Sequence, residues 1–267
     1  MMKFISFGSG SSGNCYYIAS ETTAILIDAG ISIRKIKKYF KDYGIKPSMI
    51  KAILITHDHA DHIKAAGCIS SEYFVPVYAT ELIHKGMQKN YNAFKKVDVS
   101  FAKYIDADVD FEIGDLNIKA FSLPHDSTEN VGYTIENAGT VISVMTDVGA
   151  PVEAMKSAVR QSGYVVIEAN YDDVMLQNGN YPAHLKARIT SGTGHLSNRQ
   201  TASFLAENFH EGLSNIWLCH LSEENNHPEL ARKTIEAHLN SFGFINEKDY
   251  ELEVLRRNTP TGPFDLI

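Results

Sequence analysis

Short apolar segments and polar breaks alternate along the first quarter of the chain. The apolar positions predict strands at residues 3–8, 15–19 and 24–27, and a fourth at 52–56 that is apolar almost throughout. Between the last two strands, apolar residues recur at helical spacing over 32–43, which predicts an amphipathic helix. The chain therefore begins with strands and then alternates strand and helix.

The rest of the chain predicts a second set of strands with helices beside them. Strands are expected at 75–78, 109–113, 116–123, 131–136, 141–145, 164–167 and 216–219, and helices at 63–70, 80–89, 151–158, 197–209 and 228–239. Asn226 is the expected N-cap of the last helix, and 258–263 is expected to be a loop. Because no repeat or linker interrupts this pattern, residues 1–267 are predicted to form a single domain of mixed α/β (α+β) class.

Composition narrows the class of protein. A chain of 267 residues with 44% hydrophobic and 21% charged residues is long enough to bury a large core. The net charge of -7 argues against polyanion binding by the whole surface, but it permits a locally positive cleft that contains divalent metal. The three cysteines are widely spaced among apolar residues, as reduced thiols usually are. With no signal peptide or apolar membrane span, we predict a soluble cytoplasmic protein with no membrane partner.

The strongest candidate for chemistry is the segment His57-Asp58-His59-Ala60-Asp61-His62, directly after an apolar strand. Residues two apart on an extended chain point the same way, so His57 and His59 are placed to bind one metal ion. Asp61 and His62, past the turn, are placed to reach a second ion. The alternative is a polar loop that caps a helix, with Asp61 as N-cap. We favour the two-metal site.

Three further candidates follow predicted strands. His125, Asp147 and His220 each come directly after an apolar run, and a two-metal centre needs more ligands than one loop supplies. Taken singly, each is more often a loop histidine or a capping aspartate. Their repeated placement at strand ends makes them the expected remaining ligands.

The order HxHxDH, then His, Asp and His, resembles the metallo-β-lactamase superfamily across nearly the whole chain. The resemblance implies a four-layer αββα sandwich of two mixed sheets, with two metal ions in a cleft at one edge. It implies that one ion is bound by His57, His59 and His125, the other by Asp61, His62 and His220, and that Asp147 bridges them. Asp28 matches a position that orients the histidine loop without binding metal.

This ligand set bears on the chemistry. Without cysteine, it suits hydrolysis by two divalent ions, with Zn²⁺ favoured and Mn²⁺ the alternative. A hydroxide between the two ions would be the nucleophile, and it would serve a phosphodiester, a thioester or a lactone.

The segment Gly194-His195-Leu196-Ser197-Asn198 discriminates among these substrates. It reads either as the start of an N-capped helix or, by resemblance to the phosphodiesterase branch that includes RNase Z, as a histidine placed against a phosphate. In that branch Glu168 falls at the position of the acidic partner. Such a glutamate would hold the His195 ring and raise its pKa, so that the imidazolium stabilises phosphoryl oxygens or protonates the leaving alkoxide. Asp61, Glu168 and His195 are therefore the expected catalytic residues.

Three motifs in order, residues 6–14, 194–198 and 220–226, look like the YycJ/WalJ (VicX) group of bacterial metallo-hydrolases. That resemblance implies a metal-dependent phosphodiesterase, a nuclease acting on DNA rather than RNA and working as an exonuclease. The glycine- and serine-rich loop at 8–14 either offers donors to a phosphate or is a plain hairpin connection. Candidate phosphate contacts are Ser12, Asn14, His195 and Asn225.

Two rival functions remain open from sequence. One is a thioester or lactone hydrolase of glyoxalase type, which shares the metal motif but does not need the segment around His195. The other is a non-enzymatic, metal-stabilised binding protein that has kept the ligands. The first would turn over a small acyl substrate faster than nucleic acid, and the second would be inert on both.

Overall fold

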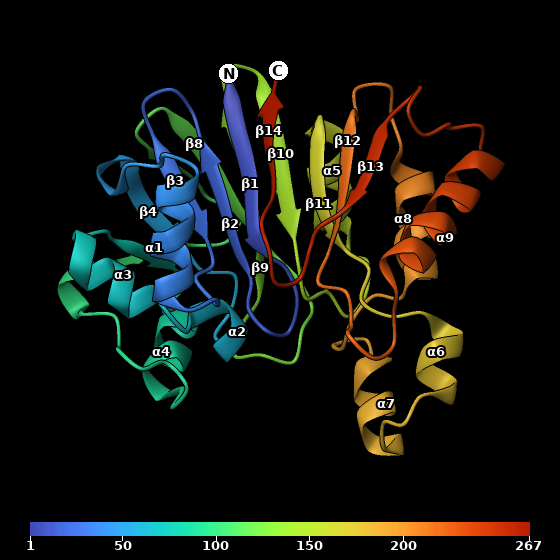
Figure 1. The fold of residues 1–267 in the computed structure, drawn as a ribbon, viewed down its shortest axis with the longest axis horizontal. Helices are drawn as coiled ribbons and strands as arrows, with labels where there is room; N and C mark the ends of the chain where they lie inside the picture. The colour runs from blue at the N-terminus through green and yellow to red at the C-terminus, as the bar shows by residue number, and fades with distance from the viewer.

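A computed structural model describes residues 1–267, which form two seven-stranded sheets packed face to face (Figure 1). The first sheet has the order β14-β1-β2-β3-β4-β5-β6 and the second the order β13-β12-β11-β10-β9-β8-β7. The strands are β1 (Met2–Gly8), β2 (Cys15–Ala19), β3 (Ala24–Ile27), β4 (Ile50–Leu54), β5 (Val77–Ala79), β6 (Ala102–Tyr104), β7 (Asp110–Ile113), β8 (Leu116–Ser122), β9 (Val131–Asn137), β10 (Thr140–Met145), β11 (Tyr164–Glu168), β12 (Asn215–Cys219), β13 (Glu251–Val254) and β14 (Thr261–Leu266).

Helices cover the outer faces of both sheets and complete the predicted four layers. They are α1 (Ile33–Asp42), α2 (Ala60–Ile63), α3 (Ala66–Tyr73), α4 (Glu81–Lys89), α5 (Glu153–Gln161), α6 (Asp173–Asn178), α7 (Ala183–Ile189), α8 (Asn198–Asn208) and α9 (Pro228–Ser241), with 3-10 turns at Pro47–Met49 and Val99–Phe101. Helices α1, α3 and α4 lie on one side, and α5, α8 and α9 on the other (Figure 1). None of these helices has the length and apolar character needed to span a membrane.

The two sheets are held together by large buried side chains. The ring centroid of Trp217 on β12 lies 4.7 Å from that of Phe4 and 4.9 Å from that of Phe264, both in the opposite sheet. Nearer the site, the hydroxyl of Tyr133 on β9 donates to the carbonyl oxygen of Ile55 at 2.7 Å. Apolar burial and this buried hydrogen bond fix how the sheets lie relative to each other.

Several element predictions were wrong or incomplete. Instead of one helix over 63–70, the chain forms α2 and then α3, because the N–H of Ala65 donates to the carbonyl of Ala29 and interrupts the helix. The predicted cap of α9 is also wrong. His227 is the N-cap, since its Nδ1 accepts from the N–H of Glu229, while the amide nitrogen of Asn226 donates to other groups.

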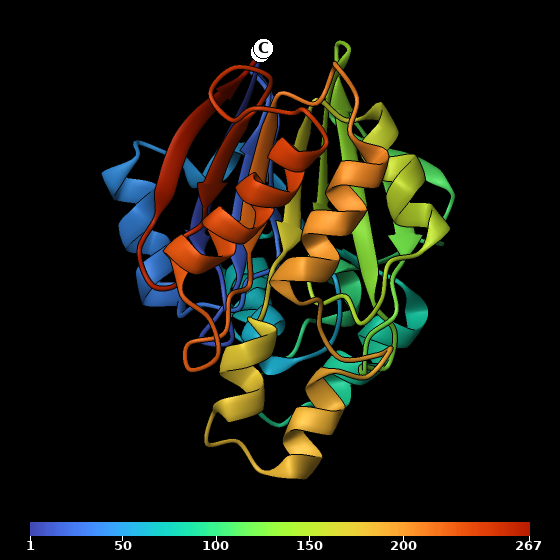
Figure 2. The ribbon, with the colours of Figure 1, turned by 90° about the vertical axis from the view of Figure 1, so that its right-hand side faces the viewer.

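Some elements were not expected at all. Residues predicted as a terminal loop enter β14, which pairs antiparallel with β1 at the edge of the first sheet. Helices α6 and α7 form a hairpin that projects beyond the end of the sandwich (Figure 2). Strands β3 and β4 run parallel in the first sheet, and β10, β11 and β12 run parallel in the second, so in each sheet their carboxyl ends lie together. The hairpin lies at this end of the molecule (Figure 1).

Candidate metal centre

Polar residues from both sheets converge where these strands end. Six buried polar residues lie at strand ends. They are Asp28 after β3, His57 after β4, His125 after β8, Asp147 after β10, His220 after β12, and Glu168, the last residue of β11. Asp28, Asp147 and His220 have φ of 60°, 58° and 52°. Non-glycine residues rarely adopt this left-handed conformation, and it is concentrated at functional sites. The sharp turn after each strand directs these side chains into the space between the sheets.

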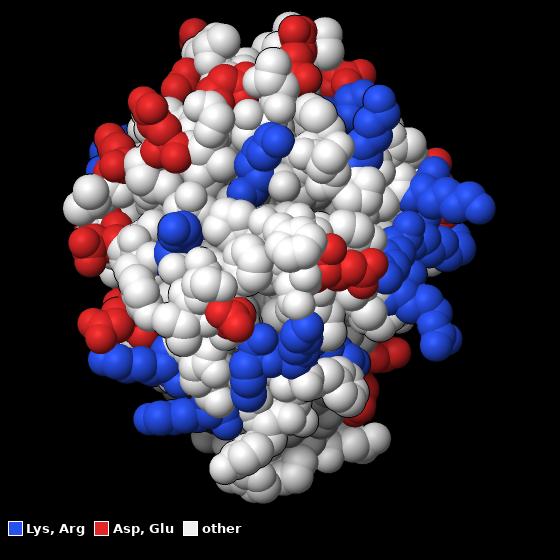
Figure 3. All heavy atoms as spheres, turned by 90° about the vertical axis from the view of Figure 1, so that its left-hand side faces the viewer, with Lys and Arg blue, Asp and Glu red and all other residues white.

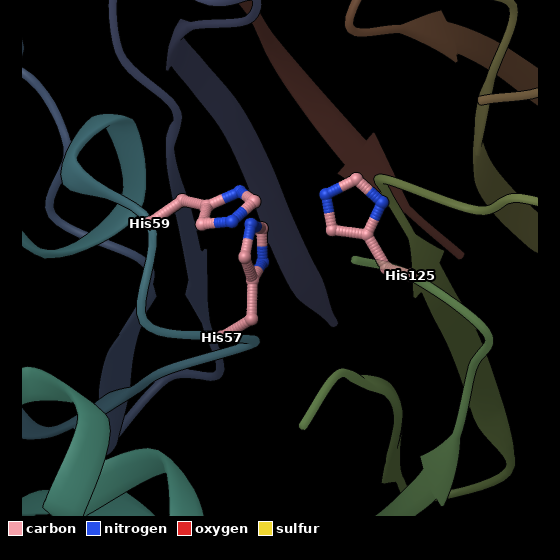
Figure 4. Close-up of side chains that lie close together, drawn as sticks. All are labelled: His57, His59 and His125. Atoms are coloured by element: carbon pink, nitrogen blue, oxygen red, sulfur yellow. The ribbon is translucent and has the colours of Figure 1, made fainter. Parts of the chain in front are cut away.

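The first group of predicted ligands is His57, His59 and His125, whose nitrogen atoms lie within 4.8 Å of one another. Figure 4 shows His57 and His59 side by side on one loop, with His125 facing them from the other sheet. The Nδ1–H of His57 donates to Thr56 Oγ1 and that of His125 to the carbonyl of Gly194, both at 3.0 Å. The Nε2 atoms of His57 and His125 are buried with no hydrogen-bond partner. Such orphaned nitrogens fit a metal ion.

The second predicted group is Asp61, His62 and His220, which also come within 4.8 Å of one another. Asp61 Oδ2 lies 3.6 Å from the Nε2 atoms of both histidines. Asp147 lies between the two groups, with Oδ2 at 3.2 Å from His62 Nε2 and Oδ1 at 3.8 Å from His125 Nε2. The structure therefore brings all seven predicted ligands together, with Asp147 in the position expected of a bridging residue.

Asp28 and Thr56 support the histidine loop from behind. Asp28 Oδ2 accepts from the Nδ1–H of His62 at 2.7 Å, and Oδ1 accepts from the N–H of Thr56 at 2.9 Å. Burial raises the pKa of Asp28 more than the charge of His62 and these hydrogen bonds lower it. This arrangement turns the Nε2 of His62 toward Asp147. The role of Thr56 was missed because a threonine at a strand end carries no sequence signal of its own.

Glu168 is fully buried and accepts hydrogen bonds from two histidines and two backbone N–H groups. Its Oε1 accepts from the Nδ1–H of His195 at 2.8 Å and from that of His220 at 3.0 Å. Its Oε2 accepts from the N–H groups of Val148 and Leu196, each at 3.0 Å. Burial acts to raise the pKa of Glu168, but the charge of His195 and the hydrogen bonds from both histidines outweigh burial and lower it.

The carboxylates make the site strongly attractive to cations. Burial acts to lower the pKa of His220, but Asp147, Asp61 and Glu168 outweigh burial and raise it to about 10. Because a metal ion takes the place of the proton on a histidine nitrogen, the same field favours a divalent cation. Histidine nitrogens and carboxylate oxygens without a thiolate are a donor set that suits Zn²⁺ or Mn²⁺.

The glycine- and serine-rich loop over 8–14 contacts the loop over residues 57–62, which we call the metal loop, through its own backbone. The N–H of Asn14 donates to the carbonyl oxygen of Asp61 at 2.8 Å, and the N–H of Ser9 donates to that of Arg257 at 3.2 Å. Two further N–H groups donate within the loop, Gly10 to Asn14 Oδ1 and Gly13 to the carbonyl oxygen of Gly10, both at 2.8 Å. These four donors are already used inside the protein. One of them, the N–H of Asn14, ties the loop to the loop that carries Asp61. Whether the remaining donors of the loop contact a phosphate stays a prediction.

The three predicted phosphate contacts on loops lie in different settings. Asn14 is buried, and its Nδ2 donates to His62 Nε2 at 2.9 Å. Ser12 is exposed, and its hydroxyl donates to Asn258 Oδ1 at 2.9 Å. Asn225 is buried against Gly179 at the end of α6, and neither of its amide atoms has a partner. Their role toward a phosphate stays a prediction.

Helix α7 contacts the loop that carries His125 through an ion pair that the sequence did not suggest. Arg188 forms a two-point ion pair with Asp126, the residue after His125, and its Nη2 donates to Asp126 Oδ1 at 3.1 Å. The two residues are far apart in sequence, so spacing alone gave no signal. This pair ties the projecting hairpin to the loop that carries His125.

Gly30 packs so closely against the metal loop that no larger residue fits there. An added Cβ at Gly30 would lie 1.6 Å from the carbonyl oxygen of Asp61. Gly30→Ala should therefore displace Asp61 and His62, lower stability by about 1–3 kcal/mol and weaken metal binding. Metal titration and urea unfolding measure both effects. Gly192→Ala is the matched control, because a Cβ there meets nothing within 4 Å; equal losses in both variants would contradict the steric argument.

Comparison with known proteins agrees with the fold. Residues 23–209 match the model of the beta-lactamase superfamily domain, and the chain belongs to that superfamily. The exodeoxyribonuclease YycJ of Bacillus anthracis is 32% identical over 264 residues, 97% of each chain. The exodeoxyribonuclease WalJ of Streptococcus pneumoniae is 35% identical over 233 residues, 87% of this chain and 86% of WalJ. The metallo-beta-lactamase fold protein YhfI of Bacillus subtilis, 15% identical, superposes with a TM-score of 0.72 over 97% of this chain and 98% of YhfI.

Proposed function

We propose that this protein is a metal-dependent phosphodiesterase that degrades DNA as an exonuclease. The observation that carries the proposal is the pairing of His195 with Glu168 beside the seven predicted ligands. A metal centre alone serves several kinds of ester, whereas a buried carboxylate that holds a second histidine at its edge suits a charged phosphodiester. The two relatives named exodeoxyribonucleases, similar along most of the chain, support DNA as the substrate.

Two divalent ions, Zn²⁺ or Mn²⁺, would be held by the two ligand groups described above, with Asp147 shared between them. When bound, such ions activate water and neutralise charge on the attacking and leaving oxygens. The chain contributes the fixed orientation of each ligand. Asp28 and Thr56 hold His62 and His57, and Glu168 holds His220.

His195 supplies a proton and a positive charge at the substrate. Burial acts to lower the pKa of His195, but the charge of Glu168 and its hydrogen bond outweigh burial and raise it. With Nδ1–H bound to Glu168, the Nε2–H of the imidazolium is free to donate to a phosphoryl oxygen or to the leaving alkoxide. The side chain is 16% exposed, so it lies where substrate can reach it.

His195→Ala tests this role. Removing the general acid is expected to lower kcat on DNA by about 10²–10⁴-fold, while both metals stay bound because His195 is not among the predicted ligands. Metal analysis and single-turnover rates on the same preparation separate the two effects. Arg199→Ala, an exposed residue on the next helix, is the control and should keep full activity.

Substrate class is tested on the same protein. A small thioester and a lactone should be hydrolysed far more slowly than DNA, and His195→Ala should leave that residual acyl activity almost unchanged. Faster turnover of the thioester than of DNA would contradict the proposed function.

A further inference from the structure

A groove next to the metal centre is not used by the chemistry described above. It encloses about 320 Å³ and runs along Ser11, Ser12, Asp61, Lys64, Tyr91 and Phe94. Because Asp61, a predicted metal ligand, lines the groove, the groove borders the metal centre. Its lining also includes the two aromatic residues of the loop after α4.

Tyr91 and Phe94 are unusually exposed for their size, at 99% and 85%. The residues beside them in the same loop, Ala93 and Val97, are buried. The loop therefore faces its small apolar residues inward and its two large rings outward. Scattered apolar residues on a surface need no explanation, but two neighbouring aromatic rings beside a polar groove indicate a binding site.

The loop that carries these rings is firmly attached. The amide nitrogen of Asn90 donates at 2.7 Å to the carbonyl of Asp58, which lies within the histidine motif. The Nζ of Lys96 donates to the carbonyl oxygens of Met87 and Asn90. The loop also packs tightly on α3, because a Cβ added at Gly67 would lie 2.1 Å from Lys95 O. The rings are thus held in a fixed place relative to the metal loop.

The charge along this side suits a polyanion even though the whole protein is acidic. Lys64 lines the groove itself. Lys89, at the end of α4, and Lys95, in the loop after α4, are exposed. Figure 3 shows the side of the molecule that carries α1, α3 and α4, where lysine and arginine side chains gather along one edge and in a band across the lower half, whereas acidic side chains are frequent toward the top. A backbone that carries phosphates would therefore be attracted to the lower part.

We propose that Tyr91 and Phe94 stack on unpaired bases of a DNA strand whose terminal phosphodiester lies at the metal centre. The proposal rests on the proposed function and adds how the substrate is held. The polar groove with Lys64 follows the backbone, and the aromatic rings take the bases without regard to sequence, since every base has a flat face. The chain therefore binds a single-stranded end of DNA rather than an intact duplex at this groove.

Affinity for labelled oligonucleotides tests the stacking separately from catalysis. Tyr91→Ala and Phe94→Ala are introduced, singly and together, into metal-loaded His195→Ala protein, which is expected to bind DNA but cleave it slowly. Fluorescence anisotropy then gives Kd for a single-stranded oligodeoxynucleotide and for an abasic strand of the same length. Each substitution should raise Kd for the normal strand by about 5- to 100-fold and leave Kd for the abasic strand unchanged.

Two controls make the result specific. Tyr91→Phe keeps the ring and should keep the affinity, and Phe242→Ala removes a ring that is 55% exposed at the end of α9 and should change nothing. An unchanged Kd in the double variant would overturn the stacking proposal even if the protein degrades DNA. Equal weakening for normal and abasic strands would also overturn it. Stacking without DNA cleavage by the unmodified protein would instead refute the proposed function and leave only the stacking of bases on the two rings standing.

Discussion

Glu168→Ala should lower the free energy of unfolding by about 3–5 kcal/mol, the loss typical of removing one partner from a buried charged network. The substitution leaves two backbone N–H groups and the Nδ1–H of His195 without their acceptor in the protein interior. His220 loses its hydrogen bond to Glu168 and keeps only Asp147 Oδ1, 3.1 Å from its Nδ1. His220 would then lose its orientation toward the metal and His195 its charge. We therefore expect activity to fall together with stability.

Glu168→Gln separates these effects. Glutamine has nearly the same shape, but its single carbonyl oxygen cannot serve all four donors. Stability should fall less than in Glu168→Ala, as measured by denaturant unfolding, while kcat on DNA falls almost as far, because the His195 imidazolium loses the negative charge that maintains it. A Glu168→Gln protein with full activity would contradict the assigned role of the carboxylate.

Asp147→Ala should have the largest effect on activity. Asp147 is the only predicted ligand with oxygen atoms facing histidines of both groups. Its loss should lower kcat/KM by more than the roughly 100-fold seen when only an outer partner of a metal ligand is removed. The number of metal ions per chain should fall at the same time. Metal analysis after dialysis and initial rates on labelled DNA measure both.

A matched control for Asp147→Ala is Asp110→Ala, which removes an exposed aspartate from β7. That variant should keep its metals, stability and activity. If Asp147→Ala also kept two metals and full activity, the carboxylate would not join the two groups of ligands, and the two-metal account of the site would be wrong.

Much of the fold followed from local patterns. The central strands were predicted because each is a short apolar run between turns, and central strands are buried on both faces. Strands β6, β13 and β14 were missed, and all three lie at sheet edges, whereas the fourth edge strand, β7, was predicted. Pro263 in β14 argues against a strand by sequence, yet an edge strand accommodates proline. Helices α6 and α7 were missed because they are short and bury few residues.

Residues of the candidate site could be predicted where they have a characteristic spacing in the sequence or directly follow a predicted strand. The histidine motif and the three strand-end residues were found in this way, and the structure brings them together. What could not be predicted are contacts that exist only after folding. The pairing of Arg188 with Asp126 joins segments 62 residues apart, and the exposure of Tyr91 and Phe94 depends on which side of their loop packs on α3.

Degradation of 5′-labelled duplex DNA, single-stranded DNA and RNA by protein loaded with Zn²⁺ or Mn²⁺ tests most directly whether this protein is a metal-dependent nuclease. We expect progressive shortening of DNA from an end, little degradation of RNA, and loss of activity in His59→Ala, which removes a predicted ligand without filling the site. A chelator should abolish activity and added metal should restore it. Intact DNA in the presence of protein with two metals demonstrably bound would contradict the proposed nuclease function.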